Sequence, residues 1–382
     1  MVKHNPAELI KRGHAAVANF QPDVAAQFFT RALESDSNNT ELMDTLADVL
    51  LQMGDAEKAI LLLHRSIALA PESSSYKYLY LAQLQDGRDA LGSVEKAVSL
   101  LARDYAATRA AEQKGSASMD TQADGENAIS AATLQKQLAK AYCTIAELFL
   151  TDLCDEEGAE QACEQALALG TEVDGESLDV LQTLASLRIS QCRAPEAGVI
   201  LAGVATRVCA ALEAAQHESP LSASANVFSG ATTTAAAAAA DECPDSQFCV
   251  STAKLLVECA CGNAPLAEQA MDLCQMLLEE DDENIELWYI MGMAALGAAP
   301  PDTEAALYHL EKAKEMTQQN EERYGADDGS KSMLVLIERR LSEAHAAAAE
   351  REIAAEAEED EDADNDIEEI TQNDCVSRVS SA

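Results

Sequence analysis

The chain has 382 residues, and its 67 acidic residues against 26 Lys and Arg give a formal net charge of −41. A chain so negative repels nucleic acid and anionic membranes, and it attracts strongly basic partners. Hydrophobic residues make up 48% and aromatic residues 4% of the chain, which suits closely packed helices better than a β-sandwich. No apolar run reaches the roughly 18 residues that a membrane span needs.

The first hundred residues repeat with a period of 34. The small or apolar residues that align across this period are Gly13 with Ala47, Ala25 with Ala59, and Phe29 with Leu63. Small residues twelve apart are typical of two helices that cross closely. Gly54 marks a turn between two helices, and Pro71 ends the second unit. This is the tetratricopeptide pattern, in which each repeat is a pair of antiparallel helices.

The pattern continues with less regularity. Gly87 lies 33 residues after Gly54, which predicts a third pair over residues 76–102. Further pairs are predicted over residues 140–173, from about residue 178, over residues 253–278, and over residues 288–316. In the last of these, Trp288 and Gly292 have the aromatic-to-glycine spacing of a first helix.

One more helix is predicted over about residues 333–357. Its apolar residues recur at intervals of three and four: Leu334, Ile337, Leu341, Ala344 and Ala348. Such a helix can cap the exposed end of a repeat array, which needs a cover.

Two segments interrupt the repeats, and neither can bury a periodic apolar face. Residues 113–130 are rich in Gly, Ser and Asp, and residues 218–246 contain a run of six alanines. We expect both to be flexible insertions. From Glu350 onward the chain holds 13 acidic residues and two arginines, a net charge of −11, so we expect residues 358–382 to form a disordered acidic tail.

The predicted fold is therefore all-α: a tetratricopeptide-repeat superhelix of about seven helix pairs with a C-terminal capping helix and a disordered acidic tail. Repeats one to three occupy residues 1–112, repeats four and five residues 131–217, and repeats six and seven with the capping helix residues 247–357.

The sequence contains no motif that predicts catalysis. There is no GxxxxGK[ST] loop, GxSxG elbow or HExxH pair. The 11 cysteines are scattered with Cys259 and Cys261 as the closest pair, and the six histidines are dispersed, so the spacing favours no zinc site. We therefore expect a protein without enzymatic activity or a cofactor. The N-terminus lacks the apolar core of a signal peptide, so we expect reduced thiols and a cytoplasmic and nuclear location.

The charge suggests a binding site instead. In a tetratricopeptide array the first helix of each pair lines an inner groove, and several of the inward positions here are acidic. The candidate partner-binding residues are Glu41, Asp44, Asp48, Asp152, Asp179 and Glu286, with Tyr289 as an aromatic contact. Each carboxylate taken alone could equally be an ordinary solvated side chain. Asp44 and Asp48, one turn apart, repel each other, and a groove lined with one sign of charge attracts a cation.

Two further comparisons refine the candidate groove. Tetratricopeptide co-chaperones hold the acidic end of heat-shock chaperones with Lys, Arg and Asn side chains. None of these residue types occupies the matching positions here, which are Ala7, Ile10, His14, Glu41, Asp44 and Asp48. That clamp is missing, and the sign is reversed. Trp288, the single tryptophan, is expected to pack between helices, and Tyr289 to contact a partner.

Three stretches go beyond a generic repeat: Ile145–Cys154, Thr183–Gln191 and Glu279–Tyr289. Together with the acidic tail they resemble the fungal dedicated assembly chaperones of the fourth large-subunit ribosomal protein. The resemblance extends over most of the chain, although the two insertions depart from it. It implies a non-enzymatic chaperone that shields a newly made basic ribosomal protein and escorts it to the nucleus for pre-ribosome assembly.

The resemblance also implies the partners. We expect a basic large-subunit ribosomal protein, bound through an extended basic segment, and a nuclear import receptor reached only through that client. Direct contacts with nucleic acid or membrane are not expected. Two alternatives remain open: a general tetratricopeptide interaction scaffold, and a histone chaperone, which shares the acidity and the basic client.

Overall fold

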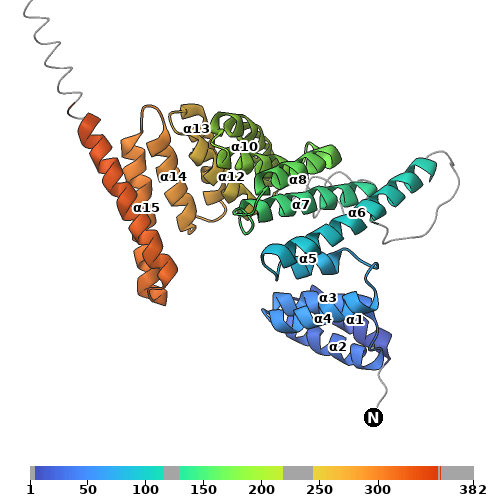
Figure 1. Cartoon of the computed structure of the whole chain (residues 1–382). Coiled ribbons are helices and arrows are strands. Elements are labelled where there is room, and N and C mark those ends of the chain that lie inside the picture. The colour runs from blue at the N-terminus through green and yellow to red at the C-terminus, as the bar shows by residue number, and fades with distance from the viewer. Residues whose placement is uncertain (1–4, 116–128, 218–243, 352, 354–382) are drawn as a thin grey trace, which may run out of the picture. The chain divides into compact units, whose positions relative to one another are not determined.

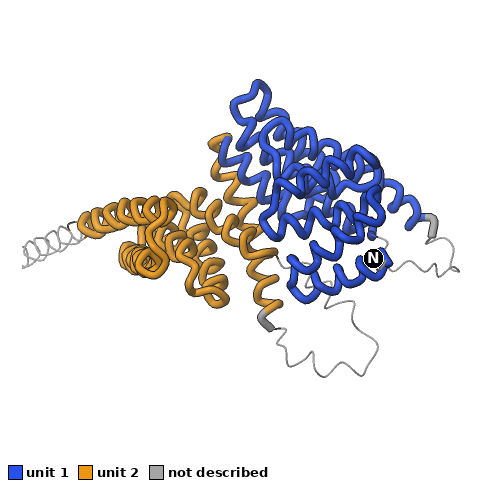
Figure 2. The backbone as a smooth tube through the Cα atoms, turned by 90° about the horizontal axis from the view of Figure 1, so that it is seen from below, with its two compact units in different colours: residues 1–190 blue, residues 191–382 orange. Residues whose placement is uncertain are grey.

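The computed structural model of the chain describes residues 5–115, 129–217, 244–351 and 353, and all regular elements in these ranges are helices (Figure 1). The chain divides into two compact units, Met1–Ser190 and Gln191–Ala382 (Figure 2). The all-α class is confirmed in the described residues. The two flexible insertions and the acidic tail predicted from the sequence lie almost entirely outside them.

The first unit contains nine helices within its described part. They are α1 (Pro6–Ala18), α2 (Pro22–Ser35), α3 (Thr40–Gln52), α4 (Ala56–Leu69), α5 (Tyr76–Ala82), α6 (Gly87–Gly115), α7 (Ala131–Leu150), α8 (Ala159–Asp174) and α9 (Leu178–Ser190). In the first four pairs the first helix packs against the second, and two sets of neighbouring first helices also touch: α3 with α5, and α7 with α9. This is the packing that the 34-residue period predicts.

The repeat period is visible in the local chemistry of the first two pairs. Asn5 caps α1 and Asn39 caps α3, because each side chain accepts a hydrogen bond from the first turn of its helix. At the first crossing, a Cβ added to Gly13 would lie 2.3 Å from the ring of Phe29. The small residue is therefore required for α1 and α2 to approach, and Phe29 is fully buried there.

The third pair is unequal. α5 has seven residues, whereas α6 has 29 and continues to Gly115, beyond the predicted end at residue 102. α7 likewise begins at Ala131, nine residues before its predicted start. The residues after 102 are mostly Ala, Arg, Glu and Gln, which favour a helix even without an apolar face to bury.

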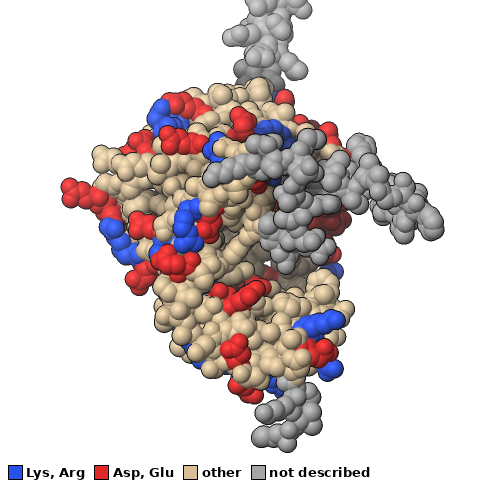
Figure 3. Space-filling view, turned by 90° about the vertical axis from the view of Figure 1, so that its right-hand side faces the viewer, with Lys and Arg blue, Asp and Glu red and all other residues tan. Residues whose placement is uncertain are grey.

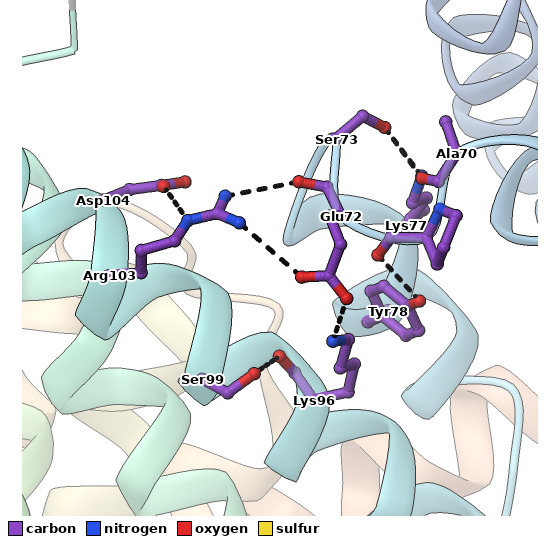
Figure 4. A network of polar contacts seen from close by, with 10 residues as sticks. Ala70, Glu72, Ser73, Lys77, Tyr78, Lys96, Ser99, Arg103 and Asp104 are labelled. Atoms are coloured by element: carbon purple, nitrogen blue, oxygen red, sulfur yellow. Dashed lines mark hydrogen bonds and ion pairs between the residues drawn. The ribbon is translucent and has the colours of Figure 1, made fainter.

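A polar network fixes the connection between α4 and the third pair (Figure 4). The Glu72 carboxylate binds Lys96 and Arg103 of α6. The side chain of Lys77 on α5 is fully buried, and its ammonium group donates to the Ala70 carbonyl and to Ser73 Oγ, the latter at 2.8 Å. Burial lowers the pKa of Lys77, although Asp44 and Glu72 oppose this effect.

A second set of contacts joins the start of α6 to the loop after α7. The Gly87 amide donates to Asp152 Oδ2 at 3.1 Å, and Arg88 forms a two-pronged ion pair with Glu156. The segments in contact are about 65 residues apart in sequence and lie on either side of the first insertion. They hold the third and fourth pairs in register.

The second unit contains α10 (Ala194–His217), α12 (Ser246–Cys259), α13 (Ala264–Leu278), α14 (Ile285–Gly297) and α15 (Thr303–Tyr324), followed by an unlabelled helix over residues 328–351. α12 packs on α13, α14 on α15, and α12 touches α14. A Cβ on Gly292 would lie 2.6 Å from Leu310 Cγ, which repeats the close crossing seen at Gly13.

α10 corrects one expectation from the sequence. Its segment Ala194–Ala215 has 22 residues and a mean hydropathy of 1.6, so by length and composition it could cross a membrane. The search for an uninterrupted apolar run did not find this segment, because polar residues such as Glu196 and Arg207 lie within it. In this structure α10 packs against α12 and α13, and it buries Leu201, Val204 and Val208 completely, as a core helix does.

The last helix packs as the predicted cap does. It begins at residue 328, five residues earlier than predicted, and buries Ile337, Leu341 and Ala344 against Leu310 and Ala313 of α15. The two helices predicted for the fifth pair are present as α9 and α10, which belong to different units. The division of the chain therefore falls within that pair and not at either insertion.

Candidate functional site

The acidic face of α3 is the strongest candidate site in the first unit. α3 contains three carboxylates, Glu41, Asp44 and Asp48, and no Lys or Arg. Glu41 is exposed, and the other two are half-buried. Helical spacing places them along one face because they lie three and four residues apart. The adjoining helix on this side is α5.

Asp44 lies at the deepest point of this face. Its Oδ1 atom is buried and has no hydrogen-bond partner in the described residues, and the same is true of the Ser66 hydroxyl on α4. Burial raises the pKa of the Asp44 carboxyl; the nearby Ser66 hydroxyl and the charge of Lys77 offset this only in part. Asp44 Oδ1 is thus free to accept a hydrogen bond from a ligand. Ionisation of the Asp44 carboxyl, however, reduces the stability of the folded state because the group is partly buried.

Asp48 adds an aromatic neighbour. Its Oδ2 atom accepts a hydrogen bond from Gln52 at 3.1 Å, and the Tyr80 hydroxyl of α5 faces it. Burial, and then the Asp48 charge, raise the pKa of Tyr80. One turn earlier, the Tyr76 hydroxyl accepts from Gln137 of α7 at 2.6 Å.

These two tyrosines were not selected from the sequence. Tyr76 and Tyr80 lie four residues apart on the first helix of the third pair, so the inward-position rule could have found them. Tyrosine beside carboxylates suits a guanidinium or ammonium group, because the ring adds a cation–π contact to the charge attraction.

Asp152 has a different environment from the one expected. It lies after the C-terminal end of α7, and its carboxylate caps α6 through the Gly87 amide. A carboxylate at a helix N-terminus is a stabilising cap. The structure therefore gives Asp152 a structural contact and does not place it on a first-helix face.

Asp179 lies in the first turn of α9, where its Oδ1 atom is 3.7 Å from Lys140 Nζ of α7. Glu147 lies on α7. Partial loss of solvent around its carboxyl raises the pKa of that group, and the negative charge of Asp179 is the next contribution. Asp179 and Glu147 therefore form a second acidic location, partly neutralised by Lys140.

The two candidate residues in the second unit also have partners. Glu286 of α14 forms an ion pair with Lys254 of α12 at 2.7 Å. Tyr289 packs against the cluster that includes Leu310 and Ile337, and its hydroxyl is near Arg340 of the last helix. Tyr289 thus contacts the capping helix, although it was expected to face a partner. Trp288 packs beside His309, with ring centroids 5.7 Å apart, as expected.

The seven candidates are divided between the two units, and the five in the first unit lie at three different places in it. Glu41, Asp44 and Asp48 share α3, Asp179 lies on α9, Asp152 lies in a loop, and Glu286 and Tyr289 belong to the other unit. No group of three potential metal ligands occurs among the residues that the structure describes. Burial raises the pKa of Cys143 and of Cys274 to about 12, so these two thiols stay protonated at neutral pH.

Comparison with known proteins gives consistent results. A tetratricopeptide-repeat family model matches residues 16–84. A Schizosaccharomyces pombe protein named "Probable assembly chaperone of rpl4" is 29% identical over 264 residues, which cover 68% of this chain and 64% of that protein. An Emericella nidulans protein of the same name is 25% identical over 323 residues, covering 80% and 69% of the two chains.

A solved structure supports the fold. "Assembly Chaperone of RpL4 (Acl4) (Residues 1-338)" superimposes with a TM-score of 0.59 at 24% identity, and the match covers 76% of this chain and 95% of that one. The resemblance inferred from the sequence is confirmed by these relatives. The match to the first relative spans just under two thirds of its length.

Proposed function

We propose that this chain is a dedicated, non-enzymatic assembly chaperone, and that it binds and shields a newly made basic protein of the large ribosomal subunit. The observation that carries this proposal is the similarity to two fungal proteins that are both named as assembly chaperones of rpl4. It extends over most of this chain, which argues for a shared architecture and a related client.

The physical chemistry of the chain supports the same function. An unassembled ribosomal protein is a polycation, and a chain with a net charge of −41 attracts it. The carboxylates on α3, with Tyr80 beside Asp48, supply a local surface for a lysine or arginine side chain. Binding to ribosomal RNA releases counterions, so RNA competes for the same basic segment and provides a route to release.

The proposal includes the cellular route. The chaperone receives its client in the cytoplasm and escorts it to the nucleus, with the import receptor contacting the client and not this chain. An acidic chaperone has no attraction to RNA of its own, so it leaves the pre-ribosome after delivery.

The decisive experiment reverses charge on the exposed part of the α3 face. The variant Glu41→Lys/Asp48→Lys changes two carboxylates that are exposed or half-buried. Asp44 is better left intact, because a lysine there would lie near the buried Lys77. We expect the affinity for the purified ribosomal protein rpl4 to fall at least tenfold, and the loss to shrink as salt rises from about 0.1 to 0.5 M.

The matched control is Glu34→Lys/Glu95→Lys, which makes the same total charge change on exposed positions of the second helices α2 and α6. We expect at most a two- to threefold effect for this control. Equal losses for both variants would mean that bulk charge alone drives binding. Unchanged affinity for the α3 variant would remove α3 from the site, and no interaction with rpl4 would overturn the function itself.

A further inference from the structure

An aromatic cluster on α14 and α15 is not part of the candidate site. The ring of Trp288 lies 5.7 Å from His309 and 6.4 Å from Tyr308, and Tyr308 meets His309 edge-on at 5.1 Å. His309 and Trp288 are half-buried, but 61% of Tyr308 is exposed. The exposed Tyr308 ring beside two further rings offers an aromatic face on which a partner's side chain can stack.

Carboxylates surround this aromatic cluster. The loop between α13 and α14 contains five consecutive exposed acidic residues, Glu279 to Glu283. Trp288 holds the loop in place, because its Nε1 donates to the Asp282 carbonyl at 3.1 Å. On α15, Glu304 and Glu311 lie four residues before and three residues after Tyr308, and therefore on its face of the helix.

On α15, the positive charge one turn beyond Tyr308 is already paired. Lys312 is the basic residue one turn beyond Tyr308, and its Nζ lies 3.9 Å from Glu315 Oε2. Burial lowers the pKa of His309, with the Asp302 charge opposing this effect, so the imidazole is neutral at pH 7. His309 therefore does not repel a cation.

From this juxtaposition we propose that the Trp288–Tyr308–His309 cluster is a docking surface for an arginine-bearing, extended segment of a partner protein. The planar guanidinium group stacks on the open face of Tyr308, and the carboxylates of the 279–283 loop and of α15 surround it. Arginine fits better than lysine, because its flat, weakly hydrated group stacks on aromatic rings. The surface belongs to the second unit, whereas the α3 face belongs to the first, and the proposal does not depend on what binds to α3.

Trp288 is the only tryptophan in the chain, so its fluorescence reports on this cluster alone. The full-length chain is titrated with a nine-residue peptide of alternating Gly and Arg, which contains no aromatic group. Matched peptides carry Lys or uncharged citrulline in place of Arg. We expect a saturable fluorescence change with the Arg peptide, a weaker affinity for the Lys peptide and no response to citrulline.

Variants locate the binding. Tyr308→Ala is expected to weaken the affinity about three- to thirtyfold, and Tyr308→Phe to preserve it. Tyr324→Ala, which removes an even more exposed tyrosine at the other end of α15, is the control and should change nothing. Replacing residues 279–283 with Gln and Asn should weaken binding at least fivefold, because five negative charges are lost from the rim.

Three results would overturn the proposal: no saturable response, the same affinity in Tyr308→Ala as in Tyr324→Ala, or Lys and Arg peptides of equal affinity. The α3 variant Glu41→Lys/Asp48→Lys should leave the fluorescence titration unchanged. The two surfaces can therefore fail independently. Affinities are compared by their midpoints, confirmed by calorimetry, because Tyr308 substitutions also alter the starting emission of Trp288.

Discussion

At the scale of single residues, the environment of a carboxylate decides its role more than its place in the repeat. Asp44 and Asp152 both occupied positions that the sequence marked as inward. Asp44 is half-buried near Lys77, whereas Asp152 lies beyond the end of α7 and caps α6. The sequence could not reveal the second case, because the end of α7 and a contact about 65 residues away determine it.

Asp44 gives a pH-dependent prediction. Its folded-state pKa is raised above 3.8 by burial, so ionisation costs the folded state stability as the pH rises through that raised value. The cost therefore grows as the pH rises above 3.8 towards and through the raised pKa, and it disappears as the pH falls below 3.8. Asp44→Asn should therefore increase the free energy of unfolding at pH 7, within about 1 kcal/mol.

The measurement is urea denaturation of Asp44→Asn and of the unsubstituted chain at several pH values. The gain should shrink as the pH falls towards 3.8. The exposed Glu41→Gln serves as the control and should show little change. A loss of stability at pH 7 would mean that the attraction between Asp44 and Lys77 outweighs the cost of burial.

At the scale of helices, the sequence predicted the pairs well and their ends less well. Small residues at the crossings and apolar spacing indicated each pair, and α1 to α4 follow the 34-residue period closely. The end of α6 was wrong by 13 residues, because its last part continues as a helix without an inward face. The 34-residue period gives the positions of the helix pairs but not the lengths of their helices. It therefore could not predict that α5 is short and α6 is long.

The close crossing of α14 and α15 can be tested with one methyl group. Gly292→Ala would place its Cβ 2.6 Å from Leu310 Cγ and 3.4 Å from the Ala306 carbonyl oxygen. Because the Leu310 branch point cannot swing aside, we expect a loss of about 1–3 kcal/mol in the free energy of unfolding of the second unit.

Gly203→Ala is the matched control in the same unit. Gly203 lies inside α10, and an added Cβ would meet nothing within 4 Å. Alanine is the better helix former, so this variant should gain up to about 1 kcal/mol. Chemical denaturation of both variants checks the pair, and similar effects in the two would show that helix propensity, not the crossing, dominates.

At the scale of the whole molecule, the negative charge is a local property more than a general coat. Residues 5–115 hold 15 acidic and 11 basic residues, so α3 is an exception within a nearly balanced region. On the face shown in Figure 3, acidic and basic side chains are interspersed among uncharged ones. Composition alone could not show this, because it assigns charge to the chain and not to a surface.

The capping helix gives a prediction for the second unit. A chain that ends at residue 327 loses Ile337 and Leu341, which are buried against Leu310 and Ala313. Burial of these two side chains contributes about 3–6 kcal/mol. We expect the second unit to unfold at lower urea, as Trp288 fluorescence reports, while hydrogen exchange in α1–α4 stays unchanged.

The control is a chain that ends at residue 353, which keeps the helix over residues 328–351 and removes residues 354–382, including the acidic tail. It should unfold at the same urea concentration as the full chain. If the shorter chain also kept its stability, residues 328–351 would not be a structural cap. If protection in α1–α4 fell too, the two units would not unfold separately.

The helix ends carry a consequence for any cationic ligand. Acidic residues occupy the first turn of most helices, such as Glu8 in α1 and Glu41 in α3, and stabilise their N-termini. Among the described helices, ten have no basic residue in the last turn. Their own last turns therefore supply no positive charge to the carbonyl ends, although at the end of α4 the ammonium group of Lys77 donates to the Ala70 carbonyl from α5. A basic ligand near those ends completes the helix electrostatics from outside, so its binding raises the melting temperature of the helices themselves.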